Sequence, residues 1–231
     1  YITLNRDPKA FLLNNMFYNP KVLGPYCERL DPSLAFVAYK KGAGECDDDL
    51  IKIAQTHGLY RDLAKYLVER QDLELWAKVL NKEEDEAESS DRRQLIDQVV
   101  EWALPESSNA DEVSCTAKAF MAADLPGELI SLLERIVLQG SDFSDNRNHQ
   151  NLLILMAIRA DSTRVAGYID EIDNFDAKDI ALICVSETHM LYEEAFSIYT
   201  KFSKPEFTPE KDEQLEMQVG FVNLFVVLFT Q

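Results

Sequence analysis

Residues 49–67 read DLIKIAQTHGLYRDLAKYL, and the spacing of the apolar side chains predicts two short helices joined by a tight turn. Leu50, Ile53 and Ala54 fall on one face of a helix of about 3.6 residues per turn. Gly58 follows them, and glycine readily ends a helix because it tolerates a left-handed backbone. The second helix and its continuation carry the apolar residues Leu59, Leu63, Tyr66, Leu67, Leu75 and Trp76.

The same helical hairpin recurs along the chain. Pairs of helices are predicted over 113–123 and 128–138, over 152–159 and 164–172, and over 177–187 and 192–202, with an irregular hairpin over 92–104. The turns at positions 58, 124, 161 and 190 lie 66, 37 and 29 residues apart, and the first interval is close to two units. A period of about 30–37 residues of paired helices is typical of an α-solenoid. The predicted fold class is therefore all-α, an α-solenoid of stacked helical hairpins with an irregular C-terminal tail.

Aromatic residues recur in the predicted helices, at Tyr66, Phe120, Tyr168, Phe196 and Tyr199. At helical spacing, such side chains favour packing between layers of helices. A ligand-binding stripe is the alternative interpretation, and core packing is the preferred one.

Two stretches depart from the repeat pattern. Residues 83–91 read EEDEAESSD, with six acidic residues and no basic one, which predicts a solvated loop; an acidic docking site is the alternative. The chain is predicted to divide into the repeats at 1–202 and an unassigned tail at 203–231. The apolar run 219–229 within that tail is interrupted by Gly220 and Asn223 and has about half the length that a membrane helix needs.

Composition narrows the class of partner. The chain has 231 residues, is 46% hydrophobic and carries a formal net charge of −18. Nucleic-acid affinity needs clustered Lys and Arg, so no nucleic-acid partner is predicted, and the same charge disfavours direct docking on anionic lipid. No secretory leader or N-glycosylation sequon is found, which favours the cytoplasm. The cysteines lie far apart without a C-x-x-C pair and predict reduced, partly buried thiols: Cys27, Cys46, Cys115 and Cys184.

The sequence contains no motif typical of catalysis, cofactor binding or metal binding. His57, His149 and His189 stand alone, without the H-E-x-x-H or cysteine pairing of a zinc site; a pH-sensing role is the alternative to an inert imidazole. Gly42 and Gly44 form a G-x-G, but position 47 is Asp and the dinucleotide fingerprint fails. No P-loop and no G-x-S-x-G elbow occurs. We therefore predict no catalytic, cofactor-binding or metal-binding residue, and a protein that is not an enzyme.

Many short runs, in collinear order from residue 1 to about 202, resemble the clathrin heavy chain. They are YITLNRDPKAFLL (1–13), YCER (26–29), DP (31–32), VAY (37–39), YLV (66–68), LELW (73–76), LIDQVV (95–100), KAFM (118–121), ADLP (123–126), ELI (128–130), NLLIL (151–155), DNFDA (173–177) and EEAF (193–196). No single run is diagnostic, but the ordered set is highly specific.

The resemblance implies a segment of the heavy-chain leg, a right-handed solenoid of clathrin-type helical hairpins. In that family three heavy chains join into a triskelion and legs run alongside one another, so the implied partners are other heavy-chain legs, with the clathrin light chain as a further one. The implied role is structural, in the coat of vesicles for endocytosis and intracellular protein transport. The implied place is the cytoplasmic face of coated pits and coated vesicles, with membrane association only through the coat. A helical-repeat interaction scaffold outside a coat is the alternative.

Overall fold

The computed structural model describes residues 7–15, 17–80, 86–104, 107, 109–186 and 188–202, and within these ranges every regular element is a helix. The helices belong to two compact units, Tyr1–Leu125 and Pro126–Gln231. The prediction of an all-α protein built from helical hairpins is confirmed. The predicted tail at 203–231 lies outside the described residues.

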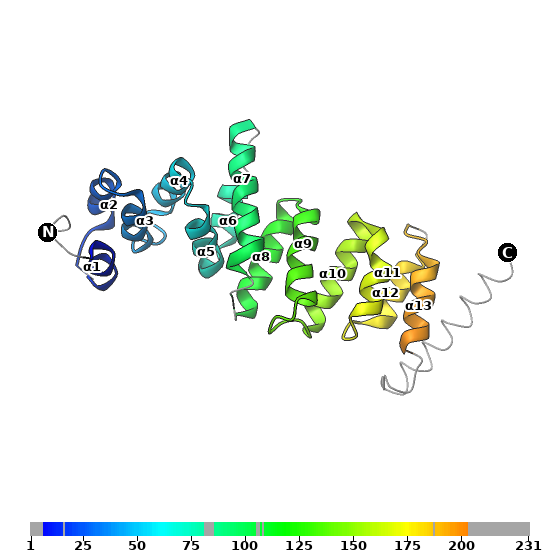
Figure 1. Cartoon of the computed structure of the whole chain (residues 1–231). Coiled ribbons are helices and arrows are strands. Elements are labelled where there is room, and N and C mark those ends of the chain that lie inside the picture. Colours follow the sequence, from blue (N-terminus) through cyan, green and yellow to red (C-terminus); the bar gives the residue numbers. More distant parts are fainter. Residues whose placement is uncertain are drawn as a thin grey trace. The chain divides into compact units, whose positions relative to one another are not determined.

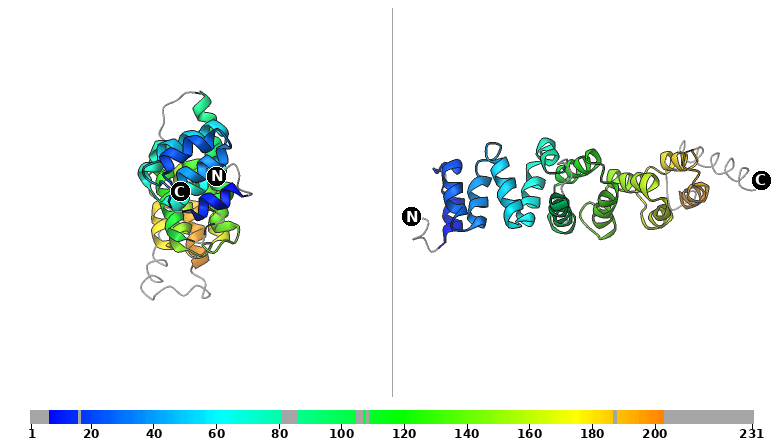
Figure 2. Two further views of the ribbon diagram at one scale, coloured as in Figure 1. Left: turned by 90° about the vertical axis from the view of Figure 1, so that its left-hand side faces the viewer. Right: turned by 90° about the horizontal axis from the view of Figure 1, so that it is seen from above.

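The first unit shows the packing of a helical-repeat stack. Helix α3 packs against α1, α2 and α4, and α5 packs against α4, α7 and α8. A helix thus contacts both its neighbour in the chain and a helix of the adjoining hairpin, and the blue to cyan helices follow one another in chain order (Figures 1 and 2). The elements are α1 (Pro8–Asn14), α2 (Pro20–Glu28), α3 (Pro32–Lys40), α4 (Asp47–His57), α5 (Tyr60–Arg70), α6 (Leu73–Leu80), α7 (Glu86–Gln98), the π-helix η2 (Val99–Ala103) and α8 (Ala110–Ala122).

The second unit repeats this arrangement. Helix α10 packs against α9, α11 and α12, and α13 packs against α11 and α12. Figure 1 shows α9 to α13 following one another in chain order. The elements are α9 (Pro126–Leu138), α10 (Arg147–Ala160), the 3₁₀ turn η3 (Ser162–Arg164), α11 (Val165–Glu171), α12 (Ala177–Cys184) and α13 (Tyr192–Phe202).

Three helices of the first unit begin in the same way. Asp7, Asn19 and Asp31 each accept a backbone N–H of the first turn with a side-chain oxygen, at 2.8–2.9 Å. A proline follows each of these caps, at the position where a helix needs no amide hydrogen. These pairs of an acidic or amide residue with proline therefore fix where α1, α2 and α3 begin.

The helix ends confirm one prediction and correct another. Gly58 ends α4 with φ 68°, in the left-handed region, as predicted. The predicted continuation of the second helix through Leu75 and Trp76 is wrong, because Gln71 also adopts a left-handed backbone, with φ 51°, and ends α5. Asp72 then accepts the N–H of Glu74 at 3.0 Å and opens α6 as a separate helix.

The predicted loop over 83–91 is wrong for residues 86–91, because α7 begins at Glu86; residues 83–85 lie outside the described ranges. Glutamate and alanine favour helices, and acidic residues near a helix N-terminus are stabilised by its partial positive charge. Clustered acidic residues are therefore compatible with the first turns of a helix as well as with a loop.

The predicted irregular hairpin over 92–104 is also wrong. The chain stays helical here, because α7 runs to Gln98 and continues directly into the π turn η2. Leu95, Ile96, Val99 and Val100 are buried, and their spacing keeps them on one face of a continuous helical segment.

The aromatic residues confirm the packing interpretation. Tyr66, Phe120, Tyr168 and Tyr199 are buried, and Phe196 is half-buried. Phe120 of α8 meets the indole of Trp76 on α6 edge-on, with ring centroids 6.0 Å apart, the geometry that aromatic pairs prefer. Tyr66 of α5 meets Phe36 of α3 in the same way at 6.4 Å. These rings join helices of different hairpins within the first unit.

Candidate functional site

The three histidines lie apart from one another in the structure. His57 is exposed at the end of α4, His149 is buried in α10, and His189 lies between α12 and α13. Over the described ranges, His, Cys, Asp and Glu residues form no group of three or more that could hold a metal ion.

The G-x-G at Gly42 and Gly44 forms a tight turn between α3 and α4. The amide of Gly44 donates to the carboxylate of Asp47 at 2.9 Å, so this donor is already used by the chain's own acid. A Cβ atom on Gly42 would lie 2.7 Å from the sulfur of Cys46. These glycines therefore permit a close turn, and their arrangement is not that of a phosphate cradle.

The four cysteines are free thiols; Cys27, Cys46 and Cys184 are buried and Cys115 is half-buried. Burial raises the pKa of each thiol, and that of Cys184 reaches about 12. Because the thiolate is the reactive form, these cysteines are poor nucleophiles. They pack as small apolar side chains, as predicted.

A groove beside α4 is lined by Asp48, Ile51, Lys52 and Gln55, together with Lys78 of α6. Lys78 donates to Asp48 at 2.8 Å. The lining contains no serine, cysteine or histidine, and its one carboxylate is held in an ion pair. These groups do not form a nucleophile–base or paired-acid arrangement.

The groups that the structure does bring together form polar contacts within and between hairpins. In the first unit, Asp47 at the start of α4 is buried and accepts a hydrogen bond from the hydroxyl of Tyr66 on α5 at 2.5 Å. Arg70 of α5 lies 3.6 Å from the same carboxylate and 6.0 Å from the Tyr66 ring centroid. Burial, followed by the bond to Asp47, raises the pKa of Tyr66. A buried carboxylate with these partners ties the turn before α4 to α5.

Two further contacts of the first unit lie nearer the surface. Lys40 at the end of α3 donates to Glu69 of α5 at 2.5 Å, and Lys78 of α6 donates to Asp48 of α4 at 2.8 Å. The first contact joins the second helices of two successive hairpins, α3 and α5. The other joins the first helices of two successive hairpins, α4 and α6. Exposed ion pairs each contribute little to stability, so these two matter only together with the other contacts.

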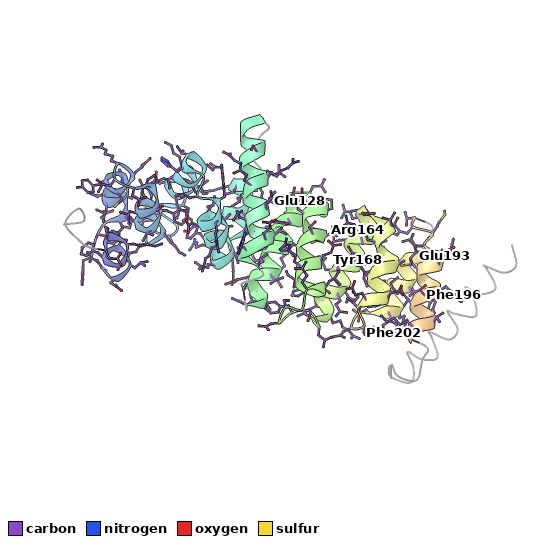
Figure 3. All side chains as sticks on the ribbon, in the orientation of Figure 1. Glu128, Arg164, Tyr168, Glu193, Phe196 and Phe202 are labelled. Atoms are coloured by element: carbon purple, nitrogen blue, oxygen red, sulfur yellow. The ribbon has the colours of Figure 1, made fainter. Side chains whose placement is uncertain are left out.

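Glu134 of α9 makes the corresponding contact in the second unit. It lies 3.1 Å from the guanidinium of Arg164 and accepts a hydrogen bond from the hydroxyl of Tyr168 at 2.5 Å. Arg164 is the last residue of η3, directly before α11, and Tyr168 lies within α11 (Figure 3). Arg164 also pairs with Asp161 at 2.8 Å, so one guanidinium is held between two carboxylates. Burial and the bond to Glu134 raise the pKa of Tyr168 to about 12.

Lys201 of α13 contacts several groups at once with its single ammonium group. Its ammonium group donates to the carbonyl oxygens of Ile169 at 2.6 Å and Ile172 at 2.8 Å, and pairs with the carboxylate of Asp173 at 2.5 Å. The last carbonyls of a helix lack partners within the helix and carry partial negative charge. Lys201 therefore satisfies the C-terminal end of α11 from the following hairpin.

A third contact of the second unit joins two of its turns. The amide side chain of Gln150 on α10 donates to the carbonyl of Ser144 at 2.8 Å and accepts the backbone N–H of Asn174 at 2.8 Å. Asn174 in turn donates from its side chain to the carbonyl of Asp145 at 2.7 Å. The α9–α10 turn is thus bonded to the segment that precedes α12.

These contacts recur at about one repeat length. The paired residues lie 29 positions apart for Lys40 and Glu69, 30 for Asp48 and Lys78, 30 for Glu134 and Arg164, and 32 for Ile169 and Lys201. The sequence pattern does not single these pairs out, because charged residues are common on helix surfaces. A search for opposite charges or hydrogen-bonding pairs about 30 positions apart would have found the three side-chain pairs. Lys201 binds backbone carbonyls, which have no signal in the sequence.

The chain is built from paired helices, and polar contacts between residues about one repeat apart join each hairpin to the next. These two features define a helical-repeat protein. A family model described as a region in clathrin and VPS matches residues 1–90 and 104–210. The chain belongs to this clathrin family.

Curated relatives agree with this assignment. The chain is 51% identical to the clathrin heavy chain of Dictyostelium discoideum over 222 residues, which are 96% of this chain. It is 54% identical over 202 residues, 87% of this chain, to the probable clathrin heavy chain 1 of Caenorhabditis elegans and to clathrin heavy chain 2 of Homo sapiens. The chain spans only 12% of the length of each of these three relatives.

Within the described part of the chain, none of the helices has the length and apolar character needed to cross a membrane.

Proposed function

We propose that this chain is a structural segment of a clathrin coat, a leg-type stack of helical hairpins that supports lattice assembly in endocytosis and vesicle-mediated protein transport. The observation that carries the proposal is that the clathrin family match, at residues 1–90 and 104–210, includes most of the hairpin stack. The contacts of Glu134 and Lys201 supply a mechanical reason, because displacing one hairpin from the next must break several of them together.

The proposed role is non-catalytic. The cysteine thiols are buried or half-buried with raised pKa values, and the G-x-G amide is bonded to Asp47. The polar side chains that contact one another join neighbouring helices, as in the pairs Glu134–Tyr168 and Lys40–Glu69. A segment whose polar groups serve packing suits a scaffold better than an enzyme.

The proposed partners are other clathrin heavy-chain legs, with the light chain as a further one. Assembly of a lattice from legs rests on many weak lateral contacts acting together, so avidity replaces a single strong site. The corresponding location is the cytoplasmic face of coated pits and coated vesicles, reached through the coat rather than by direct insertion in the membrane. The chain's net charge of −18 also disfavours direct contact with anionic lipid.

We further propose that the chain divides into the clathrin-type repeats at 1–202 and a separate tail at 203–231. The paired helices predicted from the sequence end at residue 202, which supports a boundary near there, and the family match runs on to residue 210. A truncated chain, 1–202, should then keep the helical content and the cooperative unfolding of the whole chain. A loss of cooperativity on truncation would show that the tail belongs to the repeats.

The coat proposal is tested by adding the purified chain to clathrin triskelia under conditions that assemble cages, and sedimenting the product. The chain should enter the cage pellet in proportion to the lattice formed, and should stay in solution when triskelia are omitted. An unrelated acidic helical-repeat protein of similar length serves as the control. A chain that stays in the supernatant beside well-formed cages would refute the coat proposal and favour the scaffold outside a coat.

A further inference from the structure

His149 is a buried titratable group that the packing contacts above do not use. It lies in the first turn of α10, only 6% exposed, and its ring meets Phe143 edge-on with centroids 5.9 Å apart. Its Nδ1 atom is buried and has no hydrogen-bond partner in the described structure. A buried polar atom without a partner is costly, and a buried positive charge there would be costlier.

Burial is the larger influence on this imidazole. It lowers the pKa of His149, and a hydrogen bond to the Phe143 backbone opposes it with a smaller effect. The positive end of the α10 dipole also disfavours protonation in the first turn. The charged groups on the elements that pack around α10 are Glu128, Glu134 and Arg135 on α9, Asp142 and Asp145 in the α9–α10 turn, Arg147 and Arg159 on α10, Arg164, Asp170 and Glu171 on η3 and α11, and Asp173, Asp176, Lys178 and Asp179 at α12.

The turn that covers His149 also holds two hairpins together. Ser144 and Asp145 in this turn provide the carbonyls that bond Gln150 and Asn174. Phe143, the ring against His149, lies directly beside them in the chain. Opening the turn enough to let water reach the imidazole would therefore disturb the bonds that connect the α9–α10 turn to the segment before α12.

We propose that the turn between α9 and α10 is an acid-sensitive joint: protonation of His149 opens the turn and releases the contacts to Asn174. The inference concerns the repeat stack itself and does not depend on the coat proposal.

The direction follows from linkage between protonation and opening. In the open turn the imidazole titrates near the ordinary histidine value of about 6.5, whereas in the closed turn its pKa is lower. The open form therefore gains a proton that the closed form lacks as the pH falls through about 6.5. Its population should rise by up to about tenfold per pH unit below that value, until the closed form also protonates.

The test is hydrogen exchange of the full chain at pH 7.5 and pH 5.5, expressed as protection factors so that the intrinsic pH dependence of exchange is removed. Protection across 141–150 and 172–176 should fall by up to about tenfold at the lower pH, while α3 and α5 stay unchanged. In His149→Phe, which has no group to protonate, this fall should vanish. His57→Gln, at an exposed histidine, should behave as the unmodified chain. Unchanged protection in the unmodified chain, or an equal fall in His149→Phe, would overturn the proposal.

A second measurement covers the case in which His149→Phe does not fold. The imidazole carbon resonances of the unmodified chain, followed by NMR against pH, should include one that titrates below the ordinary histidine value of about 6.5. If no resonance titrates below that value, the acid-sensitive joint is excluded.

Discussion

The ammonium nitrogen of Lys201 on α13 lies 2.6 Å from the carbonyl oxygen of Ile169 on α11. These residues are 32 positions apart, and α12 lies between their helices in the chain. The lysine therefore closes the C-terminal end of one helix with a charge from the next hairpin. This contact joins repeats through the backbone, which makes it insensitive to the side chain at position 169.

Replacing Lys201 with methionine should lower the free energy of unfolding of the second unit by about 1–3 kcal/mol, because hydrogen bonds from a charged group are lost and the α11 carbonyls are left without their partner. Urea denaturation followed by circular dichroism measures the change. Lys65→Met, at an exposed position of α5, is the matched control and should stay within about 0.5 kcal/mol. Equal effects of the two substitutions would show that Lys201 does not tie the repeats.

Tyr168→Phe removes one hydroxyl and its hydrogen bond to Glu134. The substitution should lower the free energy of unfolding by about 1 kcal/mol. Tyr192→Phe, at a half-buried tyrosine of α13, should cost less. The comparison uses the same denaturation experiment at pH 7.

Tyr168 should also contribute to alkaline destabilisation. Its pKa is raised to about 12 in the folded chain, against about 10 when unfolded, so the unfolded chain releases its proton first. The stabilisation is present below pH 10 and is lost as the pH rises from 10 towards 12. Tyr168→Phe should lose less stability over this range than the unmodified chain. An identical pH profile in both proteins would contradict the raised pKa.

Phe120→Ala should be among the most damaging single substitutions in the first unit. The phenyl ring is fully buried against Trp76, and deleting it leaves a cavity, for a loss of about 3–5 kcal/mol. Met121→Ala, at the neighbouring exposed position, should cost far less. A loss below about 1 kcal/mol for Phe120→Ala would mean that the α6–α8 seam is not a packed core.

Replacing two glycines with alanine should change the free energy of unfolding in opposite directions. Gly58 has φ 68°, where an added Cβ is strained, so Gly58→Ala should lose about 1–2 kcal/mol. Gly127 lies in the first turn of α9, and an added Cβ would meet nothing within 4 Å. Gly127→Ala should therefore gain up to about 1 kcal/mol, since glycine is a poor helix former. Thermal unfolding of the two variants gives the signs directly.

The features that could be predicted from the sequence are those that depend on residues close together in the chain. Gly58 marks a helix end because glycine favours the left-handed backbone, and the buried face of α4 follows from the spacing of Leu50, Ile53 and Ala54. Gln71 adopts the same backbone without a glycine to signal it, so the break between α5 and α6 was missed. The helical state of residues 86–91 was missed because charge composition does not separate an exposed helix from a loop.

The contacts between hairpins could not be predicted from local pattern. Glu134 and Tyr168 are 34 positions apart, and each sits among other residues of the same type. Their pairing depends on how far α11 is rotated about its axis relative to α9, which packing of the whole unit decides. The isolation of the histidines was evident from the sequence, whereas the burial of His149 beneath Phe143 required the structure.

Replacing a segment of a clathrin heavy chain tests the assignment of this chain as a leg segment. In a clathrin heavy chain such as that of Dictyostelium discoideum, which is 51% identical over the matched region, the matching segment is replaced by residues 1–202 of this chain. An unrelated α-solenoid segment of equal length serves as the control. Assembly into cages is then measured by sedimentation and electron microscopy. We expect the exchanged heavy chain to form trimers and closed cages while the control forms trimers only. Trimers of the exchanged chain that fail to build cages would contradict the assignment of this chain as a clathrin leg segment.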